Sequence, residues 1–276
     1  MPTVTTNTAA NSALRFLNYN AAQSGSSVSK LASGSRIVKA SDDAAGLAIG
    51  TRLNSDVTVL RQSAINASQG GSIMAVADGG LARIADVLQR LKALAAQSLS
   101  GVPTDTERSF IDAEFSSLIQ EIDGMAATTR FNGDSLLDGT TTSQSYFVGT
   151  DPADTIVVDF TAFSPAANYT SGSLALVTGV DTVANATSAM AEVDLAIDLI
   201  SEARANVGAI LSRFEFRGQQ ITTALENVSA ARSAIMDVDL AEEQSKLVSS
   251  QVLVQASVSA LSQANQLPQT LLQLLQ

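Results

Sequence analysis

The sequence predicts a mainly α-helical protein, an elongated antiparallel helical bundle or coiled coil with paired N- and C-terminal helices and a small β-hairpin region. Apolar residues recur at heptad spacing near both ends of the 276-residue chain, and the longest run of heptads lies just before the C-terminal segment. Aromatic residues make up only 4% of the chain and tryptophan is absent. The apolar character therefore comes from small and aliphatic side chains, which suit close helix packing.

The N-terminal segment, about residues 2–33, is expected to form one amphipathic helix. Alternating four- and three-residue steps select seven positions, six of them apolar: Ala10, Leu14, Leu17, Ala21, Ser24, Val28 and Leu31. Such a helix cannot bury its stripe alone. Gly34 suits the turn that follows. Ser41 is then expected to cap the next helix, with Asp42 and Asp43 in a first turn that favours negative charge.

The next stretch, residues 53–99, carries apolar stripes that predict a helix roughly 70 Å long if it is continuous. Glycine pairs at 70–71 and 79–80 indicate a kink or a tight helix contact. Gly101 and Pro103 interrupt the pattern. Residues 104–107, of the form T-x-x-E, are a capping box for a further helix.

Residues 140–186 differ in composition from the rest, being rich in Thr, Ser and Gly, and they predict short β hairpins and loops. Heptads resume over 193–235, which indicates coiled-coil packing. Two arginines on this stripe, Arg204 and Arg232, are expected to form ion pairs within or between copies of the chain. The alternative is that their stems pack while their charged groups reach solvent.

The C-terminal segment, residues 236–276, predicts another amphipathic helix. Leu240, Leu247, Val254 and Leu261 recur every seven residues. The chain ends in a leucine-rich stretch that includes Leu271 and Leu272. Because exposed chain ends are normally polar, an apolar end indicates burial against another chain.

Composition narrows the function. The chain has no Cys and no His, which excludes disulfides, His-containing zinc sites and a Ser–His–Asp triad. Its formal charge of -11 disfavours nucleic acid and anionic membranes as partners, and no apolar run is long enough to span a bilayer. We interpret the acidic pairs Asp42/Asp43 and Glu242/Glu243 as helix-start and surface residues. The expectation is a protein without enzyme activity, cofactor or membrane insertion.

Several motifs resemble those of the flagellin family, and together they cover nearly the whole chain. Near the N-terminus, residues 31–37 read LASGSRI and residues 41–49 read SDDAAGLAI. In the C-terminal half, residues 207–215 and 226–243 carry further matching motifs. The end, residues 263–272, resembles the closing signature of the family. Two independent terminal signatures in the right order make the resemblance specific.

The resemblance implies a structural subunit that polymerises into the bacterial flagellar filament for motility. Residues 2–42 and 236–276 would be the halves of an inner coiled-coil domain, 43–139 and 187–235 would form an outer rod domain, and 140–186 would be a short variable region. The subunit would leave the cell by type III export without a cleavable signal peptide and remain extracellular. Its partners would be itself, an export chaperone, a filament cap and hook-junction proteins. The implied polymerisation residues are Leu14, Leu17, Val28, Leu31, Leu247, Val254, Leu261, Leu271 and Leu272.

Residues 89–98 resemble the flagellin segment recognised by Toll-like receptor 5. Ala93 and Ala96 depart from the acidic and larger aliphatic residues usual there. The alternative is a solvated helix face that contacts neighbouring subunits. The positions that match the receptor pattern are Arg90, Leu94, Gln97 and Glu114.

Two other functions fit the sequence less well. A hook-filament junction protein has related terminal helices, but the full closing signature favours a filament subunit. A flagellin-like surface adhesin would need a binding surface within 140–186, and that stretch is short and poor in aromatic residues.

Overall fold

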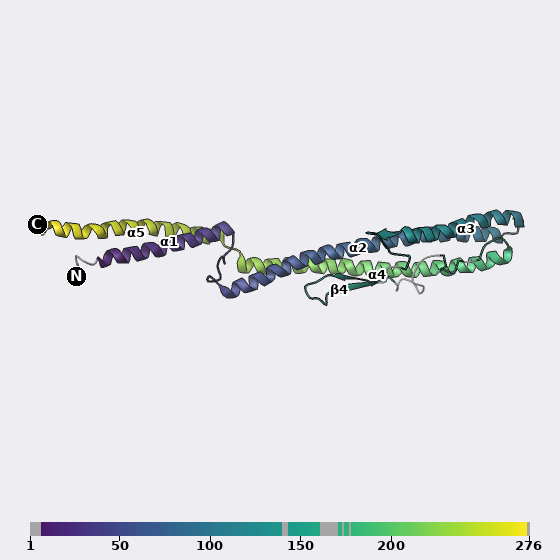
Figure 1. Cartoon of the computed structure of the whole chain (residues 1–276), viewed down its shortest axis with the longest axis horizontal. Coiled ribbons are helices and arrows are strands. Elements are labelled where there is room, and N and C mark those ends of the chain that lie inside the picture. The colour runs from purple at the N-terminus through teal and green to yellow at the C-terminus, as the bar shows by residue number, and fades with distance from the viewer. Residues whose placement is uncertain (1–6, 140–142, 161–170, 173, 177, 275–276) are drawn as a thin grey trace. The chain divides into compact units, whose positions relative to one another are not determined.

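The computed structural model describes residues 7–139, 143–160, 171–172, 174–176 and 178–274, and for 267–274 it describes the backbone alone. Five helices dominate these residues (Figure 1). They are α1 (Thr8–Ser33), α2 (Ala44–Leu99), α3 (Asp105–Thr128), α4 (Val183–Met236) and α5 (Leu240–Leu274). The strands are β1 (Arg130–Phe131), β2 (Asp134–Ser135), β3 (Ser143–Phe147) and β4 (Thr155–Asp159). The predicted mainly α fold with a small hairpin region is confirmed.

The chain divides into two compact units. The terminal unit comprises Met1–Val57 and Asn227–Gln276, and the middle unit comprises Thr58–Glu226. The unit boundaries therefore lie inside α2 and α4, whereas the boundaries that the family resemblance implies lie near the ends of these helices. The division into inner and outer filament domains stays a prediction.

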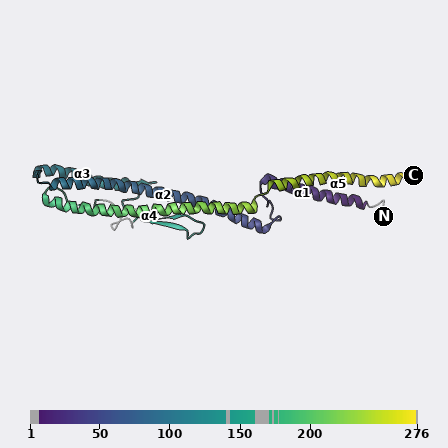
Figure 2. The same ribbon diagram turned by 180° about the vertical axis from the view of Figure 1, so that it is seen from behind.

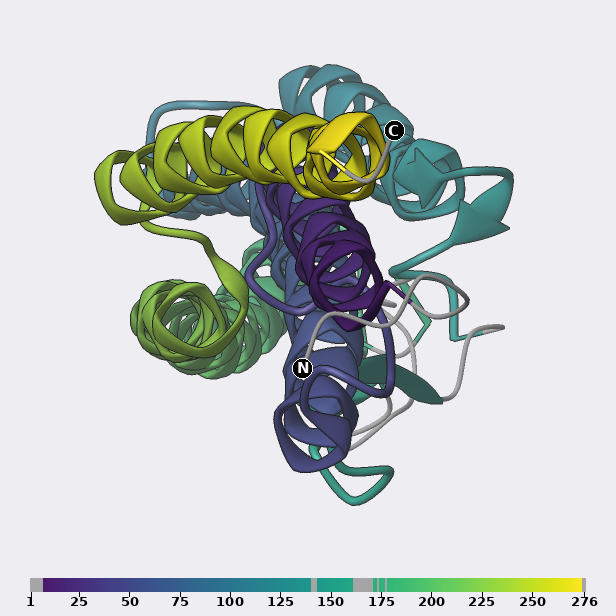
Figure 3. The same ribbon diagram turned by 90° about the vertical axis from the view of Figure 1, so that its left-hand side faces the viewer.

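Within the terminal unit, α1 and α5 lie against each other, and their backbones approach closely (Figure 3). They run antiparallel: the side-chain amide of Asn7, at the start of α1, donates to the carbonyl oxygen of Ala264, near the end of α5, at 2.8 Å. Asn20 donates to the Ser257 hydroxyl further along. The predicted pairing of the terminal helices is confirmed.

The links after α1 and before α5 are joined to each other. Ser35 and Asp237 form an isolated antiparallel bridge, and the Arg36 N–H donates to the Met236 carbonyl at 2.7 Å. Gly34 ends α1 with a φ of 68°, a conformation that favours glycine, as its sequence position indicates. The segment that follows α1 is thus tied to the segment that precedes α5.

The start of α2 corrects one prediction. The helix begins at Ala44, and the carboxylate of Asp43 accepts the N–H of Gly46 at 2.8 Å. Asp43 therefore takes the capping role that we expected of Ser41, because only its side chain lies three residues before that N–H. Asp42 instead accepts the N–H groups of Val38 and Lys39 in the preceding turn, and these bonds lower its pKa.

The core of the middle unit is built from α2, α3 and α4, which lie side by side in both side views (Figures 1 and 2). Large apolar side chains from all three helices are fully buried between them, because each helix turns its apolar stripe inward. They include Met74, Leu81, Ile84, Leu88 and Leu91 of α2, Phe115 and Ile122 of α3, and Val193 and Ile200 of α4.

The glycine pairs of α2 mark tight contacts within one continuous helix. A Cβ on Gly70 would lie 2.5 Å from the Phe214 ring, and one on Gly80 would lie 2.6 Å from the Thr129 hydroxyl. Gly71 and Gly79, the other members of the pairs, face open space. One glycine of each pair therefore permits close packing, and the other lies on an open part of the helix surface.

The capping box of α3 is present as predicted. The Thr104 N–H donates to the Glu107 carboxylate at 2.7 Å, and the Glu107 N–H donates to the Thr104 hydroxyl. β3 and β4 form an antiparallel hairpin in register from Ser143↔Asp159 to Phe147↔Thr155. Part of the predicted hairpin and loop region, including residues 161–170, lies outside the described residues.

Candidate assembly surface

The seam between α1 and α5 is built mostly from small and polar side chains. Its α1 members recur at alternating three- and four-residue steps, and so do its α5 members. Small residues let the two helices approach closely, but they bury little apolar area. The residues that the pair buries or half-buries include Ala10, Ala13, Leu17, Asn20, Ser24, Ser27 and Leu31 of α1, with Glu243, Leu247, Ser250, Val254, Ser257, Leu261 and Ala264 of α5.

The apolar stripe of α1 and its seam coincide only in part. Leu17 and Leu31 are half-buried in the seam. Leu14 and Val28, on the same stripe, stay 44% and 49% exposed. On α5, the three leucine and valine residues that we predicted at positions 247, 254 and 261 are half-buried in the seam. The side chains of Leu271 and Leu272 lie outside the described residues.

A groove runs beside the seam. It has a volume of about 500 Å³ and combines aromatic and small apolar side chains of the two helices. Phe16 and Tyr19 are 55% and 67% exposed on its α1 side, and Leu253 is 49% exposed on its α5 side. The heptad pattern does not identify either aromatic residue, because both lie outside its positions. The lining is Ala13, Phe16, Tyr19 and Asn20 with Leu253, Ala256, Ser257 and Ala260.

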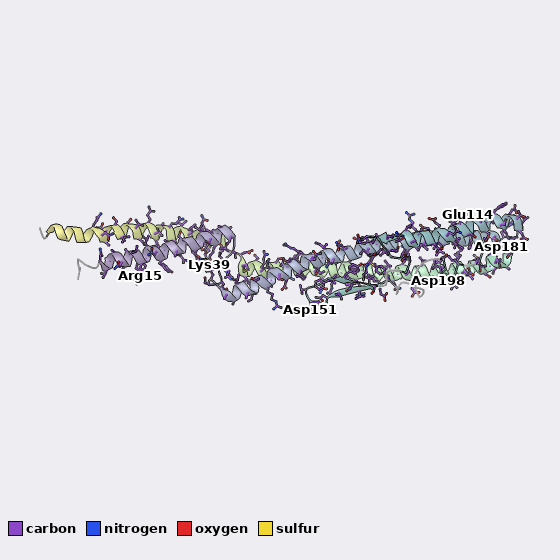
Figure 4. The ribbon with its side chains drawn as sticks, in the orientation of Figure 1. Arg15, Lys39, Glu114, Asp151, Asp181 and Asp198 are labelled. Atoms are coloured by element: carbon purple, nitrogen blue, oxygen red, sulfur yellow. The ribbon has the colours of Figure 1, made fainter. Side chains whose placement is uncertain are left out.

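Charge is distributed unequally between the units. The terminal unit has seven basic and seven acidic side chains, and the middle unit has nine and twenty, so the whole net charge of -11 belongs to the middle unit. Glu114, Asp151, Asp181 and Asp198 are among its acidic residues (Figure 4). In the described part of the terminal unit, the ion pairs all involve Lys246, whose pKa is raised by the hydrogen bond to Glu242.

The two arginines on the α4 stripe behave differently. Arg204 donates through Nε to Asp78 Oδ1 at 2.9 Å, a pair within one chain that raises the arginine pKa. Arg232 instead donates to the amide oxygen of Asn54 at 3.2 Å. The structure thus places one of the two expected ion pairs inside the chain.

The residues that match the receptor-recognised pattern lie on α2 and α3, and the structure brings some of them together. The Arg90 guanidinium makes two hydrogen bonds to Glu114 Oε1, of 2.6 and 3.0 Å, and both side chains are about half exposed. Gln97 is exposed on the same helix as Arg90. Leu94 is only 2% exposed, so it packs in the core beneath this surface.

The described residues contain no cluster of three or more side chains suited to holding a metal ion. Among them, no helix combines the length and the apolar character needed to cross a membrane. The α1–α5 pair leaves apolar side chains exposed, which is typical of a structural protein that assembles by helix packing.

Comparison with known proteins agrees with this class. The bacterial flagellin N-terminal helical region matches residues 4–142, and the bacterial flagellin C-terminal helical region matches residues 190–275. A flagellin of Halalkalibacterium halodurans is 36% identical, with 98% of each chain covered. The flagellar filament 33 kDa core protein of Treponema phagedenis is 34% identical, covering 89% of this chain and 90% of that protein. The solved structure of Bacillus cereus flagellin is 26% identical, with a TM-score of 0.49, covering 61% of this chain and 94% of that one.

The chain belongs to the bacterial flagellin family. It is a subunit of the flagellar filament, and members of the family polymerise with copies of themselves. The family resemblance stated from the sequence motifs is therefore confirmed.

Proposed function

We propose that this flagellin polymerises chiefly through the apolar side chains that the α1–α5 pair leaves uncovered. The observation that carries the proposal is the offset between the stripe and the seam: Leu14 and Val28 continue the stripe of Leu17 and Leu31 but remain exposed. The exposed groove residues Phe16 and Leu253 extend this surface. Covering these side chains with the same surfaces of other copies gains free energy that the isolated chain cannot gain.

Each half of the predicted residue set has its own role in this proposal. Leu17, Leu31, Leu247, Val254 and Leu261 hold α1 against α5 and so present the assembly surface. Leu14 and Val28 make the contacts between copies, and we include Leu271 and Leu272 with them. The neutral charge balance of the terminal unit favours this role, because copies brought together there do not repel one another strongly.

The remaining assignments follow from family membership and are part of the proposal. The subunit works outside the cell, reaches the filament through type III export without a cleavable signal peptide, and meets an export chaperone, the filament cap and hook-junction proteins on the way. It acts as a structural protein and not as an enzyme, which the absence of Cys and His from the sequence supports.

Electron microscopy of seeded assembly tests the proposal. We compare the full chain with a chain lacking residues 236–276 and with a double variant, Leu14→Asn and Val28→Asn. We expect long filaments from the full chain and none from either variant. The matched control is Leu195→Asn, at an exposed position of α4 that is 63% accessible in the middle unit. Filaments from the double variant at the wild-type critical concentration would contradict the proposal. A full chain that remains monomeric with seeds would favour a junction-protein or adhesin role.

We also propose that the α2–α3 surface of the monomer is recognised by Toll-like receptor 5. The Arg90–Glu114 pair supports this, because it fixes both side chains on one exposed face beside Gln97. A reporter-cell assay with monomeric protein tests it. Gln97→Ala should weaken activation without affecting thermal stability, whereas Leu94→Ala should reduce stability first. Equal activation by the wild type and by Gln97→Ala, or no activation by either, would contradict the proposal.

A further inference from the structure

A second groove lies in the middle unit, between α2 and α4. Its volume is about 490 Å³, and its walls are mostly small residues. Phe214 forms its floor, held by an edge-to-face contact with Tyr146 at a centroid distance of 5.4 Å. Gly71 and Gly218 open the groove, since a Cβ on either would meet no heavy atom within 4 Å. The groove residues are Ala64, Ala67, Ser68, Gly71, Ser72, Ala75, Leu211, Phe214, Glu215, Gly218 and Thr222.

Another face of the same helix carries a complementary set of side chains, Arg213, Phe216 and Arg217, which we call the Phe216 ridge and which border a shallow hollow of about 320 Å³ beside β4. Phe216 is 71% exposed, although a large aromatic side chain gains most by being buried. Arg213 is exposed one turn earlier, and Arg217 follows with a bond to Asp154 at 3.3 Å. Phe216 is two residues from Phe214, a rotation of about 200° around the helix axis. The ridge therefore points away from the groove on the opposite side of α4, at the same level along the helix.

We propose that the Phe216 ridge of one copy docks into the Gly71–Gly218 groove of a second copy, with Arg213 of the first facing Glu215 of the second. This inference rests on the proposed function, in that it assumes polymerisation and names a further contact between copies. A cavity of about 150 Å³ holds an aromatic ring of benzene size, so the groove has room for the Phe216 ring and the neighbouring side-chain stems.

Two features favour a second copy of this chain as the occupant. The first is charge complementarity: the groove carries Glu215 on its wall and the ridge carries Arg213 and Arg217. The second is geometry. Because groove and ridge lie on opposite sides of one helix, each docked copy presents a fresh ridge or groove to the next. A contact of this heterologous kind extends into a ring or a helical filament.

Seeded elongation tests the proposal, with the critical concentration measured by sedimentation of the full-length chain. Gly218→Leu fills the groove without a clash at its Cβ and improves the helix propensity of α4. Gly208→Leu is the matched control, an exposed glycine of α4 outside the groove that also has no heavy atom within 4 Å of its Cβ. We expect Gly218→Leu and Phe216→Ser to raise the critical concentration at least about tenfold, and Gly208→Leu to leave it within about twofold.

A charge-exchange series sharpens the test. Glu215→Arg and Arg213→Glu should each raise the critical concentration at least about threefold, and the double variant should return toward the wild type. Residues two apart on a helix do not face each other, so the recovery would not come from within one chain. Thermal unfolding of the monomers checks that each variant folds.

The outcomes separate the two proposals. If the wild type elongates and Gly218→Leu elongates equally well, the groove contact is overturned while assembly through α1 and α5 stands. If both single charge variants are impaired and the double variant does not recover, the facing of Arg213 and Glu215 is overturned. A wild type that does not elongate would overturn the proposed function and this inference with it.

Discussion

The two units of this flagellin differ in how their helices pack and in their net charge. The middle unit buries large side chains such as Leu91 and Ile122 completely, and it carries the entire net negative charge. The terminal unit pairs α1 with α5 through small and polar side chains and half-buried leucines and valine, and it has no net side-chain charge. Among the described residues, this seam fully buries no large apolar side chain. The middle unit therefore has a core of fully buried large side chains, whereas the α1–α5 pair has only half-buried ones. Both units expose some large apolar residues, such as Phe16 and Phe216, and our proposal is that other copies cover them.

The sharpest way to break this comparison is to truncate one leucine in each unit. Leu91→Ala removes a fully buried side chain and should cost about 3 kcal/mol of unfolding free energy in the monomer. Leu17→Ala, at a half-buried position of the seam, should cost less than about 1 kcal/mol. Urea denaturation of the monomer measures the first, and hydrogen exchange of α1 measures the second. Equal losses would show that the terminal pair has a core comparable to that of the middle unit.

A buried arginine gives the next largest effect. Arg108 is buried where α2 meets α3, and it donates through Nε to the carbonyl of Ser98 and through Nη2 to that of Ser100. Arg108→Met keeps the stem but removes the donors, and we expect a loss of about 2 kcal/mol because a buried carbonyl then lacks its partner. Its ion-pair partner Asp105 is exposed, so Asp105→Ala should cost less than about 0.5 kcal/mol. Thermal unfolding of both variants checks the difference, and equal costs would assign the stabilisation to the ion pair.

In the terminal unit, removing one buried polar group should increase stability and not decrease it. Ser27 is fully buried in the seam, and its hydroxyl makes no hydrogen bond to any residue that the structure describes. Ser27→Ala should therefore stabilise the α1–α5 pair by about 1 kcal/mol. Ser257→Ala is the control, since its hydroxyl accepts a bond from Asn20 and its loss should not stabilise. Amide exchange in α1 of the monomer reports both, and slower exchange should appear only in the Ser27 variant.

Sequence periodicity predicts the helices and the pairing of the two ends, but it does not distinguish contacts within a copy from contacts between copies. Leu14 and Leu17 look equivalent on the heptad stripe, yet only Leu17 lies in the seam. The α1 side of the seam uses Ala13 and not its neighbour Leu14, so Leu14 lies beside the contact face. Likewise, the Arg204 partner lies 126 residues away in sequence, on another helix, where no local pattern identifies it.

The capping box shows the reverse case, in which local sequence is sufficient. Residues 104–107 contain both partners, and the structure forms the bonds that the motif predicts. The Ser41 prediction failed in a similar local setting because three polar residues in a row, Ser41 to Asp43, can each serve as a cap. Only the position at which α2 begins decides between them.

The smallest predicted effect compares one carboxylate from each unit as the pH falls. Hydrogen bonds from backbone N–H groups lower the pKa of Glu107 and the pKa of Asp42 from their ordinary values. Because each folded pKa is lower than the unfolded one, each carboxylate contributes stability that is complete near neutral pH and is lost as the pH falls through the folded pKa.

Glu107→Gln and Asp42→Asn remove this titration while keeping an acceptor oxygen. We expect the difference in unfolding midpoint between the wild type and Glu107→Gln to shrink between about pH 6 and about pH 3. For Asp42→Asn, the difference from the wild type should appear in the amide exchange rates of Val38 and Lys39, whose N–H groups donate to the Asp42 carboxylate. If the middle unit folds independently of the terminal pair, Asp42→Asn leaves the midpoint of the middle unit unchanged at every pH. A shift of that midpoint would mean that the two units unfold together. The fully buried core of the middle unit and the half-buried seam of the terminal unit would then differ in burial but not in independent stability.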